Sequence, residues 1–192
     1  MSLAIKFKNT NSWLNGFSDR LVKLLRIEVS RNRTRTYKGA NGKPDRVITA
    51  PIDSSGSLRS SLEAVKKSYN DGFGSNIMGN DYANKINDGG TANPSIDSLI
   101  SWIRKKPVTL QTTGNRAVNL TEGRIKHLAK SIKKSIQSKG IKATNFIDDA
   151  LKDVMKEINS IHSPLIKDVE LNIDEILDRA GYTKQGDNYI IK

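Results

Sequence analysis

The chain of 192 residues contains no cysteine, which excludes disulfide bonds, thiol nucleophiles and zinc sites built from thiolates. Aromatic residues make up only 6% and hydrophobic residues 36%, both low for a compact globular protein, so we expect partners to cover some apolar surface. No window approaches the roughly 18 to 20 apolar residues of a membrane span, and the N-terminal apolar run is too short for a secretory signal. We expect a protein without a membrane segment that is made and used in a cytosol.

Histidine occurs only twice, at His127 and His162, and neither lies at the spacing of a metal-binding or catalytic motif. Glu170, Asp174 and Asp178 recur every four positions, which is more typical of a solvated helix face than of a cation site for phosphodiester cleavage. No serine has a base close by in the sequence to activate it. We therefore predict no catalytic, cofactor or metal site, and a protein that is not an enzyme.

Thirty-two Lys and Arg residues against twenty Asp and Glu residues give a net charge of +12, which favours polyanions or acidic protein surfaces as partners. Positive residues gather near residues 31–47 and on one face of a predicted helix. The candidates for contact with DNA or an acidic partner are Arg31, Arg33, Arg35, Lys38, Lys43, Arg46, Lys126, Lys130, Lys133 and Lys134. No aromatic residues alternate with the lysines of the second group, so any DNA contact there is expected to be nonspecific and directed at phosphates. A solvated helix face would show the same lysine pattern.

Apolar residues at helical spacing predict most of the secondary structure. Helices are expected over residues 12–25, 94–106, 121–139 and 144–161, followed by a C-terminal helix that ends near Gly181. Turn residues predict hairpins around Asn41-Gly42, Asn70-Asp71-Gly72 and Gln185-Gly186-Asp187, whereas residues 108–119 are expected to form a loop.

Local signals mark the ends of several helices. Pro94 or Ser95 opens one helix, Thr144 is expected to cap another, and Gly140 ends the lysine-rich one. Gly89-Gly90 can take the left-handed conformation after a short helical turn. These elements predict an α+β fold, with amphipathic helices packed on a small antiparallel sheet.

Residues 50–62, APIDSSGSLRSSL, combine a proline, an aspartate, small hydroxyl residues and one glycine ahead of a short helical pattern. The proline favours an extended entry, and Asp53 or Ser55 is placed to cap a helix that begins near Gly56. The two leucines that follow are expected to face inward, and the arginine between them outward, where it can meet a carboxylate. We interpret the segment as a structural corner with no chemistry implied. The residues that define it are Pro51, Asp53, Ser55, Gly56, Leu58 and Arg59.

Four segments in this order resemble motifs of the tail-completion proteins, also called neck or head-to-tail joining proteins, of long-tailed bacteriophages. The corner resembles their signature A-P-V-D-T-G-x-L-R-x-S-I, with Ser54 as one extra residue. The other three segments are DYANKINDGG (81–90), NPSIDSLISWIRKK (93–106) and KGIKATNFIDDAL (139–151). The resemblance runs from about Leu14 to Ile158.

The resemblance implies a non-enzymatic structural protein of the virion, with α+β subunits that form a ring, expected to be hexameric, between the head connector and the tail. Its partners would be other copies of the chain, the neighbouring connector and the tail-terminator or tail-tube proteins. Such a ring would be assembled in the cytoplasm of the host bacterium and would give DNA a passage, with some positive residues facing that DNA. The alternative is a free basic protein that binds or processes nucleic acid.

The same resemblance implies a domain organisation. We expect one tail-completion-like domain over residues 1–160, with a basic hairpin arm near 31–47 and an inserted helix near 94–106. Residues 161–192 are expected to form a C-terminal extension, a helix followed by a small hairpin.

Overall fold

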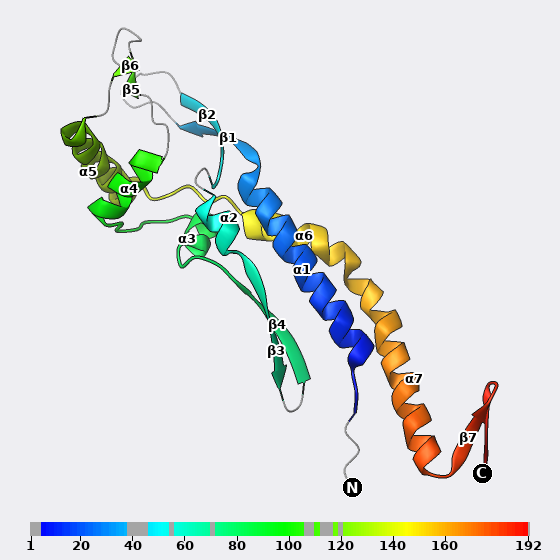
Figure 1. Ribbon diagram of the computed structural model, residues 1–192. Helices are drawn as coiled ribbons and strands as arrows, with labels where there is room; N and C mark the ends of the chain where they lie inside the picture. Colours follow the sequence, from blue (N-terminus) through cyan, green and yellow to red (C-terminus); the bar gives the residue numbers. More distant parts are fainter. Residues whose placement is uncertain are drawn as a thin grey trace. The chain divides into compact units, whose positions relative to one another are not determined.

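The computed structural model describes residues 5–37, 46–53, 56–69, 72–105, 110–111, 117–118 and 121–191 (Figure 1). The chain divides into two compact units. Unit 1 comprises Met1–Leu24, Glu63–Met78 and Leu151–Lys192, and unit 2 comprises Leu25–Leu62 and Gly79–Ala150. The division falls inside two helices, α1 (Lys8–Ser30) and α6 (Phe146–Val154).

The strands in the described part of the chain pair in twos, as antiparallel sheets. The pairs are β1 (Asn32–Tyr37) with β2 (Arg46–Pro51), β3 (Glu63–Tyr69) with β4 (Gly72–Met78), β5 (Leu110–Gln111) with β6 (Ala117–Val118), and β7 (Tyr182–Gln185) with β8 (Asn188–Ile191). Together with the helices they confirm the α+β class. The three predicted hairpins form as β1–β2, β3–β4 and β7–β8, although the turn residues Asn41-Gly42 and Asn70-Asp71 lie outside the described residues. The predicted loop over 108–119 contains β5 and β6, and its other residues also lie outside.

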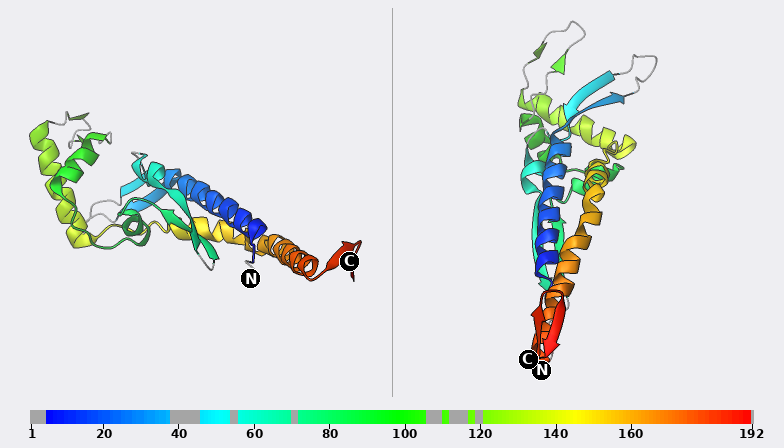
Figure 2. Two further views of the ribbon diagram at one scale, coloured as in Figure 1. Left: turned by 60° about the horizontal axis from the view of Figure 1, so that its bottom comes forward. Right: turned by 90° about the vertical axis from the view of Figure 1, so that its right-hand side faces the viewer.

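In unit 1 the first part of α1 lies beside the C-terminal helices, which run in the opposite direction (Figures 1 and 2). These C-terminal elements are a 3₁₀ helix, η1 (Met155–Ile161), and α7 (His162–Arg179), which follows it directly. Arg20 Nε forms an ion pair with Glu157 Oε2 at 2.7 Å, and the backbone N–H of Thr10 donates to Asp168 Oδ2 at 2.7 Å. These contacts join the start of α1 to α7 and its middle to η1.

The helix predicted over 144–161 is discontinuous, since α6 ends at Val154 and η1 follows. Phe146, Ala150 and Val154 are buried at a spacing of four residues, so one narrow stripe faces the core. Leu151 lies beside this stripe and is exposed.

In unit 2 the helices α4 (Ile96–Lys105) and α5 (Glu122–Lys139) pack on each other. Their shared core consists of Leu99, Ile103, Ile125 and Ala129. The predicted apolar stripes are therefore correct, but the stripe of α5 packs on α4, whereas we expected the amphipathic helices to pack on a small antiparallel sheet. The stripe of α4 already offers α5 a complementary apolar surface. Ser95 Oγ accepts a hydrogen bond from the N–H of Ser98 at 3.0 Å and so opens α4 as predicted.

The remaining helices of unit 2 are short. They are α2 (Ser57–Ser61) and α3 (Ala83–Asp88). Unit 2 also contains the last turns of α1 and the start of α6. Val29, Leu58, Leu62 and Phe146 of these elements are all at most 4% exposed. No helix among the described residues combines the length and the apolar character that crossing a membrane requires.

Candidate functional site

The predicted corner forms where β2 ends. Asp53 Oδ2 accepts a hydrogen bond from the backbone N–H of Arg59 at 2.6 Å, in the first turn of α2. Gly56 precedes this helix with φ +76°, a left-handed conformation that glycine adopts without strain. Leu58 is buried and Arg59 is exposed, as predicted. Ser55, the other predicted cap, lies outside the described residues.

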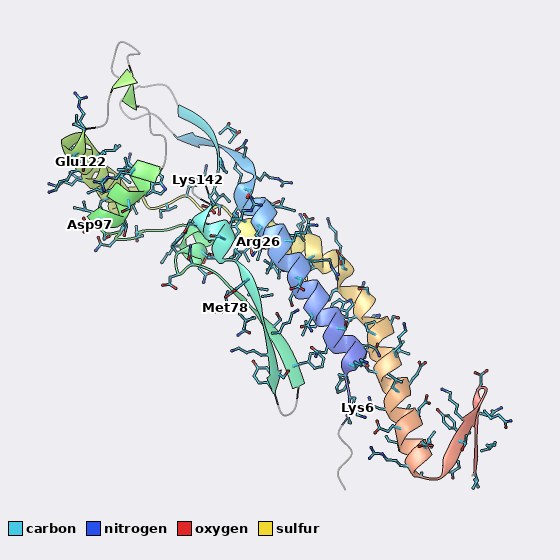
Figure 3. The ribbon with its side chains drawn as sticks, viewed as in Figure 1. Lys6, Arg26, Met78, Asp97, Glu122 and Lys142 are labelled. Carbon is cyan, nitrogen blue, oxygen red and sulfur yellow. The ribbon has the colours of Figure 1, made fainter. Side chains whose placement is uncertain are left out.

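The last turns of α1 hold both ends of this corner. Arg26, labelled in Figure 3, donates from Nη2 to the carbonyl of Leu62 at 2.7 Å. The backbone N–H of Asp53 donates to the carbonyl of Val29 at 2.9 Å. The corner is therefore attached to the helix by backbone groups at its entry and its exit.

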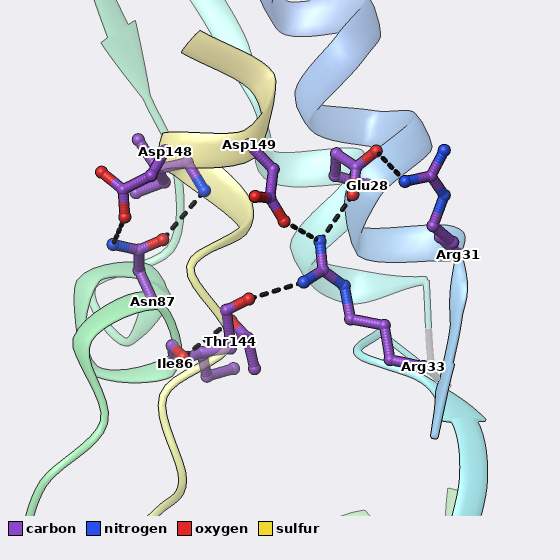
Figure 4. A network of polar contacts seen from close by, with 9 residues as sticks. Glu28, Arg31, Arg33, Ile86, Asn87, Thr144, Asp148 and Asp149 are labelled. Carbon is purple, nitrogen blue, oxygen red and sulfur yellow. Dashed lines mark hydrogen bonds and ion pairs between the residues drawn. The ribbon is translucent and has the colours of Figure 1, made fainter. Parts of the chain in front are cut away.

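Arg33, on β1, joins three segments of unit 2 (Figure 4). Its Nη2 forms ion pairs with Glu28 of α1 and with Asp149 Oδ2 of α6, the latter at 2.7 Å. Its Nη1 donates to the carbonyl of Thr144 at 2.7 Å. Glu28 is only 4% exposed, so its carboxylate depends on this guanidinium and on that of Arg31, whose Nη1 lies 3.0 Å from Glu28 Oε1. We call these five residues the arginine junction.

Asn87, at the end of α3, caps α6 from outside that helix. Its Oδ1 accepts a hydrogen bond from the N–H of Ile147 at 2.8 Å, and its carbonyl accepts from the N–H groups of Thr144 and Asn145 at 3.0 and 3.1 Å. Asn145 has φ +52°, which asparagine tolerates better than most residues. The predicted Thr144 cap is wrong, because the Thr144 hydroxyl donates to the carbonyl of Ile86 at 2.8 Å.

After α3, the backbone at Gly89-Gly90 passes close to the backbone of Ile141 and Ala143, and we call this point the crossing. Both glycines have positive φ, +74° and +98°, but ψ of Gly89 is −155°, which lies outside the left-handed conformation that we predicted. A Cβ on Gly89 would lie 2.6 Å from the nitrogen of Ala143 and 2.6 Å from the carbonyl oxygen of Ile141. Gly90 forms an isolated antiparallel bridge with Ile141. Position 89 therefore requires glycine for two reasons: a Cβ would clash with neighbouring backbone atoms, and the φ angle is positive.

The structure changes the interpretation of the first basic group. Arg33 is largely buried in the arginine junction, and Arg31 is paired with Glu28, so neither is a simple free contact for DNA. Arg35 and Arg46 lie in β1 and β2, while Lys38 and Lys43 lie outside the described residues. The ion pairs of these two arginines contribute to the structure of unit 2, and the sequence did not reveal them because the acidic partners do not form a recognisable sequence pattern with the arginines.

The second basic group lies where the sequence placed it. Lys126, Lys130 and Lys134 are exposed on α5, and Lys133 is partly exposed. Within the described ranges no carboxylate forms an ion pair with any of the four. These lysines are the candidate contacts for phosphate or for an acidic protein surface.

The acidic residues of α7 take part in contacts within unit 1. Asp174 accepts hydrogen bonds from the hydroxyl of Tyr189 and from Lys184 Nζ, and these bonds lower the pKa of Asp174. The bonds of Asp174 tie the C-terminal hairpin to α7.

Among the residues that the structure describes, no three His, Asp or Glu side chains form a group that could hold a metal ion.

Sequence reasoning missed the cap that Asn87 provides and the acidic partners of Arg33. Asn87 and Ile147 are 60 positions apart, and Arg33 and Asp149 are 116 positions apart. No local spacing rule relates such residues. In comparisons with known proteins, the chain matches no protein-family model, no curated protein and no solved structure.

Proposed function

We propose that this chain is a structural protein of the virion of a long-tailed bacteriophage, a neck subunit that joins the head connector to the tail. The proposal starts from the resemblance of four segments to tail-completion proteins. The observation that supports it most is that residues 50–62, 81–90 and 93–106 belong to one compact unit, unit 2, together with the fourth segment except its last residue, Leu151. Segments that resemble successive motifs of one family are thus parts of one folded body.

Three of these segments are bonded to one another. Asn87 of the second segment caps the helix of the fourth, and Gly90 bridges to Ile141. The corner is tied to the second segment through Asn80, the residue before that segment: the N–H of Asn80 donates to Ser61 Oγ at 3.0 Å, and its Nδ2 donates to the hydroxyl of Tyr82 at 3.0 Å. Amide, hydroxyl and backbone groups of these segments therefore fix the segments to one another.

The proposed assembly is a hexameric ring in the neck, formed in the cytoplasm of the host bacterium from identical copies. Its neighbours are the head connector and the tail-terminator or tail-tube proteins. The lysines of α5 then face either the phosphates of the passing DNA or the acidic surface of an adjacent ring. Exposed apolar side chains, which are numerous in unit 1, are covered by neighbouring copies.

Electron microscopy tests this proposal. The purified chain is imaged alone and after mixing with connector and tail components of the same phage. We expect rings that attach to the connector. A matched variant, Asn87→Ala, removes the cap between segments and should weaken attachment more than Asn84→Ala, an exposed change on the same helix. The proposal fails if no ring forms under either condition.

The second candidate is a free basic protein that binds or processes nucleic acid, and the unpaired lysine face of α5 favours it. A gel-shift experiment at near-physiological salt, with and without Mg²⁺, separates the two functions. Tight binding or cleavage of DNA by the monomer would favour the second candidate. Weak binding that Lys130→Gln with Lys134→Gln reduces, and that falls steeply with salt, would fit a phosphate-facing surface in a ring.

A further inference from the structure

The helix pair of unit 2 carries half of the net positive charge of the chain. Helices α4 and α5 contain eight basic and two acidic residues between them, a net charge of +6 out of +12. Glu122, one of the two acids, is paired with Arg104 Nη2 at 2.7 Å. Asp97, the other, lies in the first turn of α4, where it complements the helix dipole. Both acids therefore have a role within the pair, and neither neutralises a lysine of α5.

Four lysines form one face of α5, which we call the lysine face. They are Lys126, Lys130, Lys133 and Lys134. At 100° per residue they fall within a sector about 100° wide, and they extend along about 12 Å of the helix axis. The other residues of that sector are Gly123 and Gln137, so the sector contains no apolar side chain. The lysine face is therefore a surface of positive charge alone.

The apolar side of α5 is already covered within the protein. Ile125 is 6% exposed and Ala129 is fully buried, and both pack with Leu99 and Ile103 of α4. A basic helix that binds a membrane has to lay its apolar side on the lipid. Because α4 occupies that side of α5, a lipid surface is a poor partner for the lysines.

The composition of the lysine face favours DNA over a protein partner. The centre of a protein interface is usually apolar and poor in lysine, whereas this face has no apolar side chain to bury. A partner held by charge alone needs a dense negative charge, and double-stranded DNA carries one for about every 1.7 Å of its axis. Single strands are bound by stacking their bases on aromatic side chains, and α5 contains no Phe, Tyr or Trp. The features together favour a DNA duplex.

We propose that the lysine face of α5 binds the phosphate backbone of double-stranded DNA without reading its base sequence. The inference deepens the proposed function by choosing DNA over the acidic surface of an adjacent ring, and it rests on that function for its setting. Each lysine that meets a phosphate releases counterions, so four contacts weaken the affinity about a hundredfold between about 50 and 200 mM salt. We therefore expect binding that is measurable at low salt and weak near physiological salt.

Fluorescence anisotropy of a short labelled duplex, measured with the full chain over a series of salt concentrations, tests the inference. The lysine-face variant replaces the four lysines together by glutamine, which favours helices about as well as lysine. We expect its affinity at about 50 mM salt to fall more than about tenfold. The slope of log affinity against log salt should become shallower by about three to four.

A matched control removes the same number of charges from unit 1. It replaces four exposed lysines on four other elements by glutamine, namely Lys23, Lys67, Lys152 and Lys167. Both variants have the same net charge, but only the control keeps the lysine face. We expect the control to bind the duplex within about threefold of the wild type, with an unchanged salt slope. Equal losses in the two variants would overturn the inference, because overall charge would then explain the binding. Circular dichroism checks that the helix content is the same in all three chains.

Other outcomes would also overturn the inference. One is a wild-type chain that binds no duplex at about 50 mM salt, and another is tighter binding of a single strand of the same length. Competition by polyglutamate or by phosphatidylglycerol vesicles that matches the duplex, charge for charge, would assign the face to an acidic protein or to lipid.

The two proposals fail separately. Duplex binding through the lysine face by a chain that is absent from phage particles would sustain this inference and contradict the proposed function. A chain that is present in the particles but whose lysine face does not bind duplex DNA would do the reverse.

Discussion

Single polar side chains hold together segments that are distant in the chain. Arg33 links α1, β1 and α6, and Asp168 links α7 to the start of α1. Each is a charge removed largely or fully from water, so its contribution depends on partners that remain in place. Loss of one partner leaves the other charge buried, which is the most destabilising kind of change at such a site.

Replacing Arg33 by methionine is expected to lower the free energy of unfolding by about 3 kcal/mol, because Glu28 would keep a buried charge without its main partner. Arg31→Met is the matched control. The Arg31 side chain is 63% exposed, and an exposed ion pair contributes no more than about 1 kcal/mol. Urea unfolding at neutral pH measures both variants, and equal losses would show that Arg33 is not the residue on which the junction depends.

Asp168 makes the stability of unit 1 depend on pH in the acid range. Burial by itself raises the pKa of Asp168, but hydrogen bonds from Thr10 and Asn9 outweigh it and lower the pKa from 3.8 to about 2. Folding therefore favours the carboxylate. The stabilisation is fully present above pH 3.8 and is lost as the pH falls through about 2.

Asp168→Asn is expected to lower the free energy of unfolding at pH 7 by about 1–3 kcal/mol, because the amide would turn an N–H group toward donors that need an acceptor. The same variant should flatten the loss of stability between pH 4 and pH 2. Glu170→Gln, an exposed change on the same helix, should leave both properties unchanged. Denaturation at a series of pH values supplies the comparison, and an unaltered acid profile in Asp168→Asn would contradict the assignment.

At the scale of elements, helices begin and end through groups contributed by other elements. Asn87 from α3 caps α6, and Asp168 from α7 caps α1, so α1 begins at Lys8, earlier than the sequence predicted. Sequence reasoning found the features that depend on local patterns. These are the apolar stripes of α4 and α5, the Ser95 cap and the turn residues of the hairpins. Caps that come from 60 or 159 positions away leave no local pattern.

The crossing after α3 can be tested with two adjacent glycines. Gly89→Ala should lower the free energy of unfolding by more than about 2 kcal/mol, since its Cβ would overlap backbone atoms of Ile141 and Ala143 in addition to the strain of positive φ. Gly90→Ala should cost only about 1–2 kcal/mol, because that position is open and only the strain applies. Thermal unfolding of the two variants separates the cost of the steric clash from the cost of the strained φ angle. A larger loss of stability in Gly90→Ala than in Gly89→Ala would show that the crossing is not tightly packed.

At the scale of the whole chain, each unit is built from segments that are far apart in the sequence. No linker-like composition marks the division, because it falls inside α1 and α6, whose apolar stripes continue across it. The exposed apolar stripe of α7, by contrast, could have been recognised from the spacing of Ile166, Val169, Ile173 and Ile176. The sequence shows that these residues share a face but does not show that the rest of unit 1 leaves the face uncovered.

The central claim is that this chain is a component of the phage neck. If a phage genome encodes this chain, quantitative mass spectrometry of mature particles of that phage, with the head connector as internal reference, tests the claim most directly. We expect the chain to be present at about six copies per particle, the number that a closed hexameric ring requires. Particles that lack the chain, purified from cells in which it is abundant, would contradict the claim.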